Sequence, residues 1–209
     1  MNIIRYVGGP VDANCYIITF NTKAIIIDPC VKLDIIKKAL GSYKLDFIIV
    51  THGHYDHICC LKEIVDYYQI PIYLAKNAIE KLEDPAKNCS LFLGKPTSFS
   101  FPKDRYHIVN DYEKVIVDGE DILFMHTKGH TDCSICIRIG NNFFSGDTLF
   151  KGSVGRCDLY SGNERELWIS LANLKSYFTK NNDLVIYPGH EEASTSKEGL
   201  ATNPYLVNA

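Results

Sequence analysis

The sequence has no run of basic residues, no long apolar segment and no leader-like N-terminus, and each absence excludes a class of protein. Lysines and arginines are scattered through the 209 residues, and the formal net charge is −3. Binding to nucleic acid or to an anionic membrane is therefore not expected. Apolar stretches such as 24–27 and 47–50 are far too short to span a bilayer. Residues 1–5 lack the sections of a signal peptide, so we expect a cytoplasmic protein.

The sequence also has no linker segment, and it lacks the two pairs of closely spaced cysteines that a four-sulfur zinc site needs. No low-complexity segment interrupts the chain, so a single domain spanning 1–209 is expected. The eight cysteines are spread out, and only Cys133 and Cys136 have the spacing of a zinc knuckle. No second pair completes a four-sulfur site. Without a secretory signal, free thiols in a reducing compartment are the preferred interpretation.

Hydrophobic periodicity predicts an alternation of strands and helices. Strands are expected at 3–7, 15–20, 24–27, 47–50, 70–75, 114–117, 122–126, 134–139, 142–145 and 183–187, and helices at 33–40, at 58–68, around 79–82 and after Asn163. Residues 85–111 show no periodicity and indicate either an active-site flap or a packed surface loop. Two rounds of strand meander followed by strand–helix units predict an α/β fold, a four-layer α/β/β/α sandwich of two mixed β-sheets.

The most informative stretch is 52–57, which holds three of the seven histidines. Its candidate ligands are His52, His54, Asp56 and His57. Imidazole nitrogens and carboxylates are the ligands that borderline divalent metals such as zinc prefer. The stretch follows the predicted strand 47–50, so we expect it to form a strand-to-helix loop that presents these side chains to metal.

Three further candidate ligands each follow a predicted strand: His130, Asp147 and His190. Strand ends at one edge of a sandwich are close in space, so these loops are expected to converge on the first. The complete set then divides between two metal ions. His52, His54 and His130 would hold one ion, Asp56, His57 and His190 would hold the other, and Asp147 would bridge both.

Such a set predicts metal-assisted hydrolysis. Two divalent ions roughly 3.5–4 Å apart lower the pKa of a shared water toward about 7, which yields a bridging hydroxide at neutral pH. The same ions polarise a carbonyl and stabilise the oxyanion that forms. Asp56 is the expected catalytic residue, because it is both a ligand and the neighbour best placed to orient the hydroxide. The predicted cofactor is a pair of divalent ions, most readily zinc.

Four motifs carry a family resemblance: residues 51–57, 129–131, 146–150 and 188–190 resemble the metallo-β-lactamase superfamily. The resemblance extends from the strand at 14–16 to the tail at 202–206. Within the superfamily, 146–150 together with 155–159 resembles the glyoxalase II branch. This resemblance implies the same sandwich, a site that accepts zinc, iron or manganese, and hydrolysis of thioesters such as S-lactoylglutathione. The expected partner is thus a small-molecule thioester.

The chain departs from full glyoxalase II near its end. Only 19 residues follow His190, too few for the C-terminal helical domain that grips glutathione in that family. Glu192 stands where the family has a tyrosine that contacts glutathione. Arg156 falls where the family has a basic residue near the substrate, although it could simply pair with Asp158 to hold its loop. The chain is most similar to the short, one-domain glyoxalase II-like hydrolases.

The alternatives to the hydrolase are a persulfide dioxygenase, a binding protein and a nuclease. A persulfide dioxygenase would use one iron on His52, His130 and Asp147, but the proline at 188 favours the hydrolase, because such dioxygenases usually have alanine there. A binding protein that has lost its chemistry is not favoured, because no ligand is missing. A nuclease would need a basic surface or an added domain. His107 and His126 match no ligand position and are interpreted as structural, while Cys133 and Cys157 lie in loops expected near the metals.

Overall fold

Two six-stranded sheets, each accompanied by helices, make up the chain in the computed structural model, which describes residues 1–209. The chain divides into two compact units, which we call unit 1 (1–109 with 117–119) and unit 2 (110–116 with 120–209). None of the helices combines the length and the apolar character needed to cross a bilayer. The predicted α/β class with two mixed sheets is confirmed.

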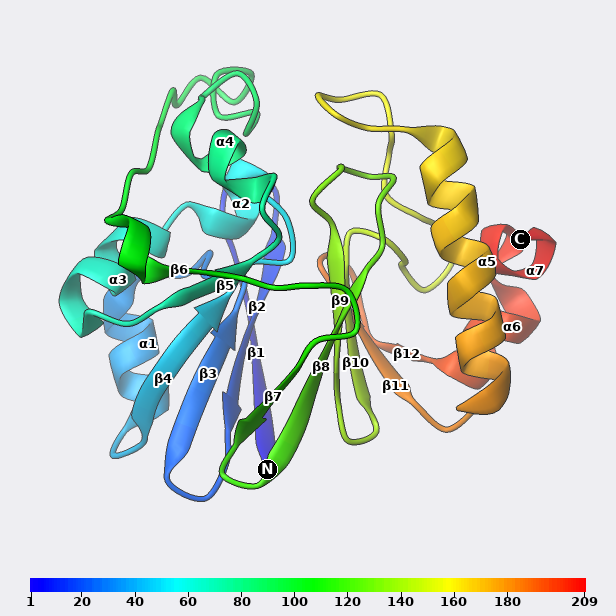
Figure 1. Ribbon diagram of the computed structural model, residues 1–209, viewed down its shortest axis with the longest axis horizontal. Coiled ribbons are helices and arrows are strands. Elements are labelled where there is room, and N and C mark those ends of the chain that lie inside the picture. The colour runs from blue at the N-terminus through cyan, green and yellow to red at the C-terminus, as the bar shows by residue number, and fades with distance from the viewer. The chain divides into compact units, whose positions relative to one another are not determined.

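The sheet of unit 1 begins as a meander and continues as parallel strands (Figure 1). Its order is β1 (Asn2–Gly8), β2 (Ala13–Thr19), β3 (Lys23–Ile27), β4 (Lys44–Ile49), β5 (Ile72–Leu74) and β6 (Tyr106–Ile108). β1 to β3 pair antiparallel, and β3 to β6 pair parallel. The helices are α1 (Leu33–Leu40), α2 (Tyr55–Ile58), α3 (Leu61–Tyr68) and α4 (Ala78–Glu83), with a 3-10 turn at Lys103–Arg105.

The sheet of unit 2 has the order β12 (Ser194–Thr195), β11 (Val185–Pro188), β10 (Asn142–Gly146), β9 (Ile135–Ile139), β8 (Glu120–His126) and β7 (Lys114–Val117). β10 and β11 pair parallel, whereas β8 with β9, β9 with β10 and β11 with β12 pair antiparallel. The helices are α5 (Glu164–Lys180), α6 (Ser196–Thr202) and α7 (Pro204–Asn208). The apolar stripe of α5 packs into one core with Phe143 and Ile186 of the sheet, and α6 and α7 lie beside α5 (Figure 1).

The long helix of unit 2 begins where its sequence predicts. The side-chain oxygen of Asn163 accepts a hydrogen bond from the backbone N–H of Glu166 at 3.1 Å, which satisfies one of the free donors at a helix start. The four predicted core positions of this helix are all buried: Leu167, Leu171, Leu174 and Phe178.

Three segments differ from the prediction. The expected helix at 58–68 is two helices, because the chain turns at Cys59 and Cys60, where the N–H of Cys60 donates to the carbonyl of Pro29 at 3.1 Å. Residues 85–111 include β6, whose three residues are too few to show an alternating pattern. The rest of that segment is partly packed, since Phe99 is buried while Phe92 is 78% exposed. The elements at 194–208 were not predicted.

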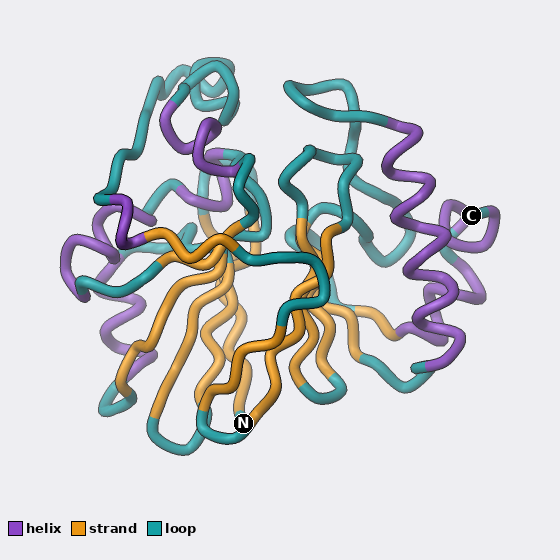
Figure 2. The backbone as a smooth tube through the Cα atoms, viewed as in Figure 1, coloured by secondary structure: helices purple, strands orange, loops and turns teal.

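Strand direction explains where the predicted ligands emerge. β3 and β4 are parallel neighbours, so their C-terminal ends share one edge of the sheet of unit 1. In unit 2, β8 and β10 both pair antiparallel with β9, and β11 is parallel to β10. The loops after β8, β10 and β11 therefore leave from the same edge of that sheet, as the tube drawing shows (Figure 2). These are the loops that carry His130, Asp147 and His190.

Candidate metal centre

The four predicted ligands of unit 1 are gathered at the end of β4. His52 and His54 lie in the loop that follows the strand, whereas Asp56 and His57 belong to α2. The expectation of a loop for all four residues was therefore wrong for the second pair. All four are at least 92% buried. The loop passes so close to α4 that a Cβ at Gly53 would lie 2.6 Å from Cβ of Lys81, so only glycine fits.

A buried aspartate that was not among the predicted ligands organises the histidines of unit 1. Asp28 is 1% exposed and follows β3. Its Oδ1 accepts the backbone N–H of Thr51 at 2.8 Å, and its Oδ2 accepts the Thr51 hydroxyl at 2.6 Å. Oδ2 also lies 2.9 Å from Nδ1 of His57. Because a carboxylate only accepts, this Nδ1 carries the hydrogen, and Nε2 keeps its lone pair.

The same network orients His52. The Thr51 hydroxyl gives its hydrogen to Asp28, so toward His52 Nδ1, 3.0 Å away, it acts as the acceptor. Nδ1 of His52 then carries the hydrogen, and its Nε2 is left with a lone pair. The His52 ring contacts two neighbouring rings, with centroids 4.8 Å from His54 and 4.3 Å from His57. One carboxylate thus sets the tautomers of two predicted ligands, which is how proteins commonly orient metal-binding histidines.

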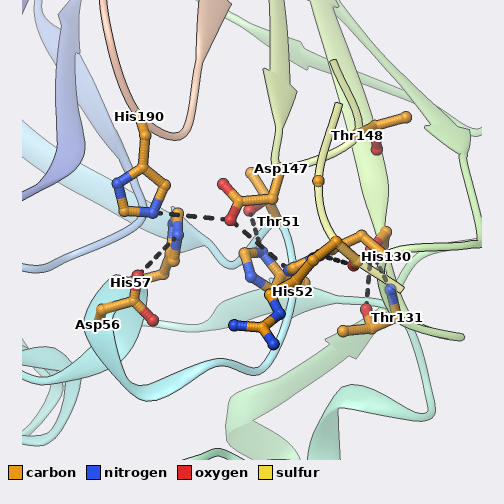
Figure 3. Close-up of polar contacts among 12 residues, drawn as sticks. Thr51, His52, Asp56, His57, His130, Thr131, Asp147, Thr148 and His190 are labelled. Atoms are coloured by element: carbon orange, nitrogen blue, oxygen red, sulfur yellow. Dashed lines mark hydrogen bonds and ion pairs between the residues drawn. The ribbon is translucent and has the colours of Figure 1, made fainter. Parts of the chain in front are cut away.

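In unit 1, His57 also meets a second carboxylate. Its Nε2 lies 3.3 Å from Oδ2 of Asp56 (Figure 3). Zinc–nitrogen and zinc–oxygen bonds are about 2.0–2.2 Å, so two donors of one tetrahedral ion are separated by about 3.4 Å. The observed separation fits that value. This pair therefore has the chemistry and the spacing of two donors to one ion.

In unit 2, Asp147 lies between the other two predicted histidines. Its Oδ2 is 3.6 Å from Nε2 of His130 and 3.6 Å from Nε2 of His190 (Figure 3). Nδ1 of His130 lies 2.7 Å from the backbone carbonyl of Arg156, which can only accept, so Nε2 of His130 carries the lone pair. His130 and Asp147 are buried, and the His190 side chain is 21% exposed. Both distances are close to the separation of two donors that share an ion, so Oδ2 of Asp147 can act as a donor beside each of the two histidines.

Glycines allow these loops to come together. The N–H of Gly189 donates to the carbonyl of Gly146 at 2.8 Å, which ties the loop of His190 to that of Asp147. Gly155 fits still more tightly, because a Cβ there would lie 2.0 Å from the carbonyl oxygen of Asp147 and 2.8 Å from Nδ1 of His130.

The variant Gly155→Ala should therefore push apart the Asp147 and His130 backbones. We expect a loss of about 1–3 kcal/mol in the free energy of unfolding, as for other overpacked sites, together with weaker zinc binding. Urea unfolding and zinc titration measure the two effects. Gly152→Ala is the matched control, because nothing lies within 4 Å of a Cβ at that position. Equal behaviour of the two variants would contradict this description of the loop.

Other residues singled out in the sequence have structural surroundings. The Arg156 guanidinium makes two hydrogen bonds to Asp158, at 2.6 and 2.7 Å, and lowers the pKa of that carboxyl to about 2. The pairing interpretation thus matches the geometry, and contact with substrate stays a prediction. His107 stacks on Tyr73 with centroids 4.1 Å apart. The groups that could hold a metal contain histidine and aspartate, and neither Cys133 nor Cys157 takes part.

Comparison with known proteins identifies the family. The model of the metallo-beta-lactamase superfamily matches residues 8–190. A "probable metallo-hydrolase" of Methanocaldococcus jannaschii is 32% identical over 197 residues, which cover 91% of this chain and 93% of that protein.

The crystal structure of the BLEG-1 B3 metallo-beta-lactamase has a TM-score of 0.89 at 28% identity, covering 98% and 99% of the two chains. The structure of TTHA1623 in a di-iron-bound form has a TM-score of 0.82 at 25% identity, with 97% and 99% covered. This chain therefore belongs to the metallo-beta-lactamase superfamily.

Proposed function

We propose that the chain is a binuclear metallohydrolase that cleaves a thioester of a small thiol. The observation that carries the proposal is the position of Asp147, whose Oδ2 is equidistant from Nε2 of His130 and of His190. One ion would be held by His52, His54 and His130, and the other by Asp56, His57 and His190, with Asp147 shared. Family membership and the order of the four motifs support the proposal that the ligands of unit 1 and those of unit 2 bind the same pair of ions.

The donor set suits divalent ions. It combines five neutral imidazoles with two carboxylates, so part of the metal charge is left to act on substrate. When bound, such a pair of ions supplies a nucleophilic hydroxide at neutral pH and an electrophilic environment for a carbonyl. Zinc is the expected ion, and the di-iron form of TTHA1623 supports iron as an alternative.

The protein's own residues have distinct tasks in this proposal. Asp28 and Thr51 hold the rings of His52 and His57 with their Nε2 lone pairs directed away from the network. Asp56, whose Oδ2 lies 3.3 Å from the His57 ring, is placed to accept a hydrogen bond from the attacking oxygen and so to orient it. Arg156 is exposed in the loop after β10, and its carbonyl meets His130. Its guanidinium would bind an anionic thiol carrier by exchanging its pairing with Asp158 for the ligand.

Metal analysis combined with three substrate assays tests the proposal. We expect about two ions per chain and release of thiol from S-lactoylglutathione, both lost after dialysis against a chelator and restored by zinc. One iron per chain with oxygen uptake on glutathione persulfide would overturn the hydrolase in favour of the dioxygenase.

A second candidate function is hydrolysis of a β-lactam, because BLEG-1, described as a B3 metallo-beta-lactamase, matches over nearly the whole chain. Both reactions add hydroxide to an acyl carbon. They differ in the leaving group, a thiolate from the thioester and a ring nitrogen that takes up a proton from the β-lactam, and in which substrate the loops admit. Ring opening of a chromogenic cephalosporin is the third assay. Turnover of the β-lactam without turnover of any thioester would replace the first proposal with the second.

A further inference from the structure

Unit 1 has a pocket whose wall contains two thiols. The cavity has a volume of about 540 Å³ and is bordered by the end of β1 at residues 7–10, the start of α1 and Tyr55. Cys59 and Cys60, at the junction of α2 and α3, lie in its wall, and both are partly exposed. Their Sγ atoms are 3.9 Å apart. None of the proposed metal chemistry uses these sulfur atoms.

The two thiols are held in different ways. Cys59 Sγ faces two backbone carbonyls, that of Cys30 at 3.5 Å and that of Asp56 at 3.9 Å. It therefore has acceptors for its hydrogen and acts as a donor. Cys60 is fixed through its backbone N–H, which donates to Pro29, and its Sγ lies 3.9 Å from that of Cys59, a contact in which either thiol can be the donor. The hydrogen bond with Cys59 lowers the pKa of Cys60. Burial and the charge of Glu63 oppose this shift, and the charge of Lys32 assists it.

The other thiols with shifted pKa values are poor nucleophiles by comparison. The hydrogen bond with Cys15 raises the pKa of Cys30, and burial raises the pKa of Cys136 to about 12. Burial also raises the pKa of Cys157. Because the thiolate is the reacting form in disulfide exchange, Cys60 is distinguished from each of them.

The border of the pocket is cationic. Lys32 and Lys95 both line it and both are exposed. No acidic side chain lines it. Apolar surface is supplied by Val7, Val31 and Ile35. A ligand that matches this border has a short apolar body, negatively charged ends and a sulfur that can reach Cys60.

We propose that this pocket is a thiol–disulfide exchange site, in which Cys60 forms a mixed disulfide with a small anionic disulfide. The Cys60 thiolate attacks one ligand sulfur, the ligand S–S bond breaks and a new S–S bond forms. The departing half leaves as a thiolate and takes up the proton that Cys60 has lost. One chain with reduced Cys60 and one disulfide thus give one mixed disulfide and one free thiol, so atoms and electrons balance.

Three small symmetrical disulfides of different charge test the site: dithiodiglycolate (anionic), bis(2-hydroxyethyl) disulfide (neutral) and cystamine (cationic). Each rate of adduct formation on the folded chain, measured by mass spectrometry, is divided by the rate on the chain unfolded in urea. We expect one adduct, located on Cys60, and a normalised rate that falls from the anion to the cation. Adduct formation elsewhere, or equal normalised rates for the three probes, would overturn the proposal.

Variants separate the roles of the sulfur and the border. Cys60→Ser should abolish the adduct, while Cys59→Ser and the control Cys89→Ser, outside the pocket, should keep it. Lys32→Gln combined with Lys95→Gln should reduce the preference for the anion, by roughly two- to fivefold per lysine, as expected for exposed charges. A preference that survives the loss of both lysines would show that they do not recognise the ligand. An internal Cys59–Cys60 disulfide that forms only when a probe is added, with release of both halves of the probe as thiols, would support the proposal, because Cys59 then displaces the second half from the mixed disulfide.

Discussion

Replacement of Asp147 by alanine is expected to remove at least one of the two proposed metal ions and to lower the proposed thioester turnover by more than about a hundredfold. Oδ2 of this side chain is 3.6 Å from Nε2 of each of His130 and His190. Loss of a hydrogen-bond partner of a ligand already costs about 10–100-fold in metal affinity or activity. Removal of the ligand that the proposed function assigns to both ions should cost more.

Metal content and turnover are measured together for this variant. Asp121→Ala serves as the control, since that carboxylate is exposed and pairs with Lys114 on the surface of the same unit. Asp147→Ala should also unfold cooperatively, so that metal loss is not the result of a misfolded chain. Two bound ions and a normal rate in the variant would show that Asp147 bridges nothing.

The second large effect is expected from Asp28→Asn, a change that keeps the size of the side chain and removes its charge. Asparagine has one accepting oxygen, whereas Asp28 accepts from the Thr51 N–H, the Thr51 hydroxyl and Nδ1 of His57. An amide NH₂ toward His57 would force Nδ1 to accept and Nε2 to carry the hydrogen. Nε2 could then no longer bind a metal, and we expect affinity to fall by about 10–100-fold.

Nitrogen NMR of the histidine rings gives a direct readout of this change, independent of activity. The wild-type chain should show His57 with its hydrogen on Nδ1, and the variant should show it on Nε2. Asp66→Asn is the control, because that exposed carboxylate pairs only with Lys62 on α3. An unchanged tautomer in Asp28→Asn would refute the orienting role of Asp28.

The sequence predicts much of the fold because its signals are local. The Asn163 cap and the apolar stripe of α5 both lie within one helix, and turns such as Gly140–Asn141 join adjacent strands. Five of the seven predicted ligands are likewise found in loops that follow strands, since the C-terminal ends of parallel strands gather their loops, whereas Asp56 and His57 lie on α2. Their grouping within each unit follows from strand order, which the two meanders already indicate.

What could not be predicted depends on contacts distant in sequence. Asp28 precedes Pro29 at the end of a strand, where aspartate commonly serves a turn, and its partners Thr51 and His57 are more than 20 residues away. The Arg156 carbonyl accepts a hydrogen bond from Nδ1 of His130. Every residue has a backbone carbonyl, so the residue type at this position could not predict the contact. β6 joins its sheet by pairing with a strand more than 30 residues earlier. A buried carboxylate after an apolar strand is nevertheless a signal, because it must find donors.

The network around Asp28 also bears on the entropy of ion capture. Two imidazole rings of unit 1 are immobilised when the chain folds, by hydrogen bonds that do not depend on an ion. Ordering a flexible side chain at the moment of binding costs about 0.5–1.5 kcal/mol. In this chain the two rings lose their conformational entropy when the chain folds, so the donors are already ordered when an ion binds. A rigid set of this kind selects by the size and coordination preference of the ion, and ions as similar as zinc and iron would compete for it according to their supply.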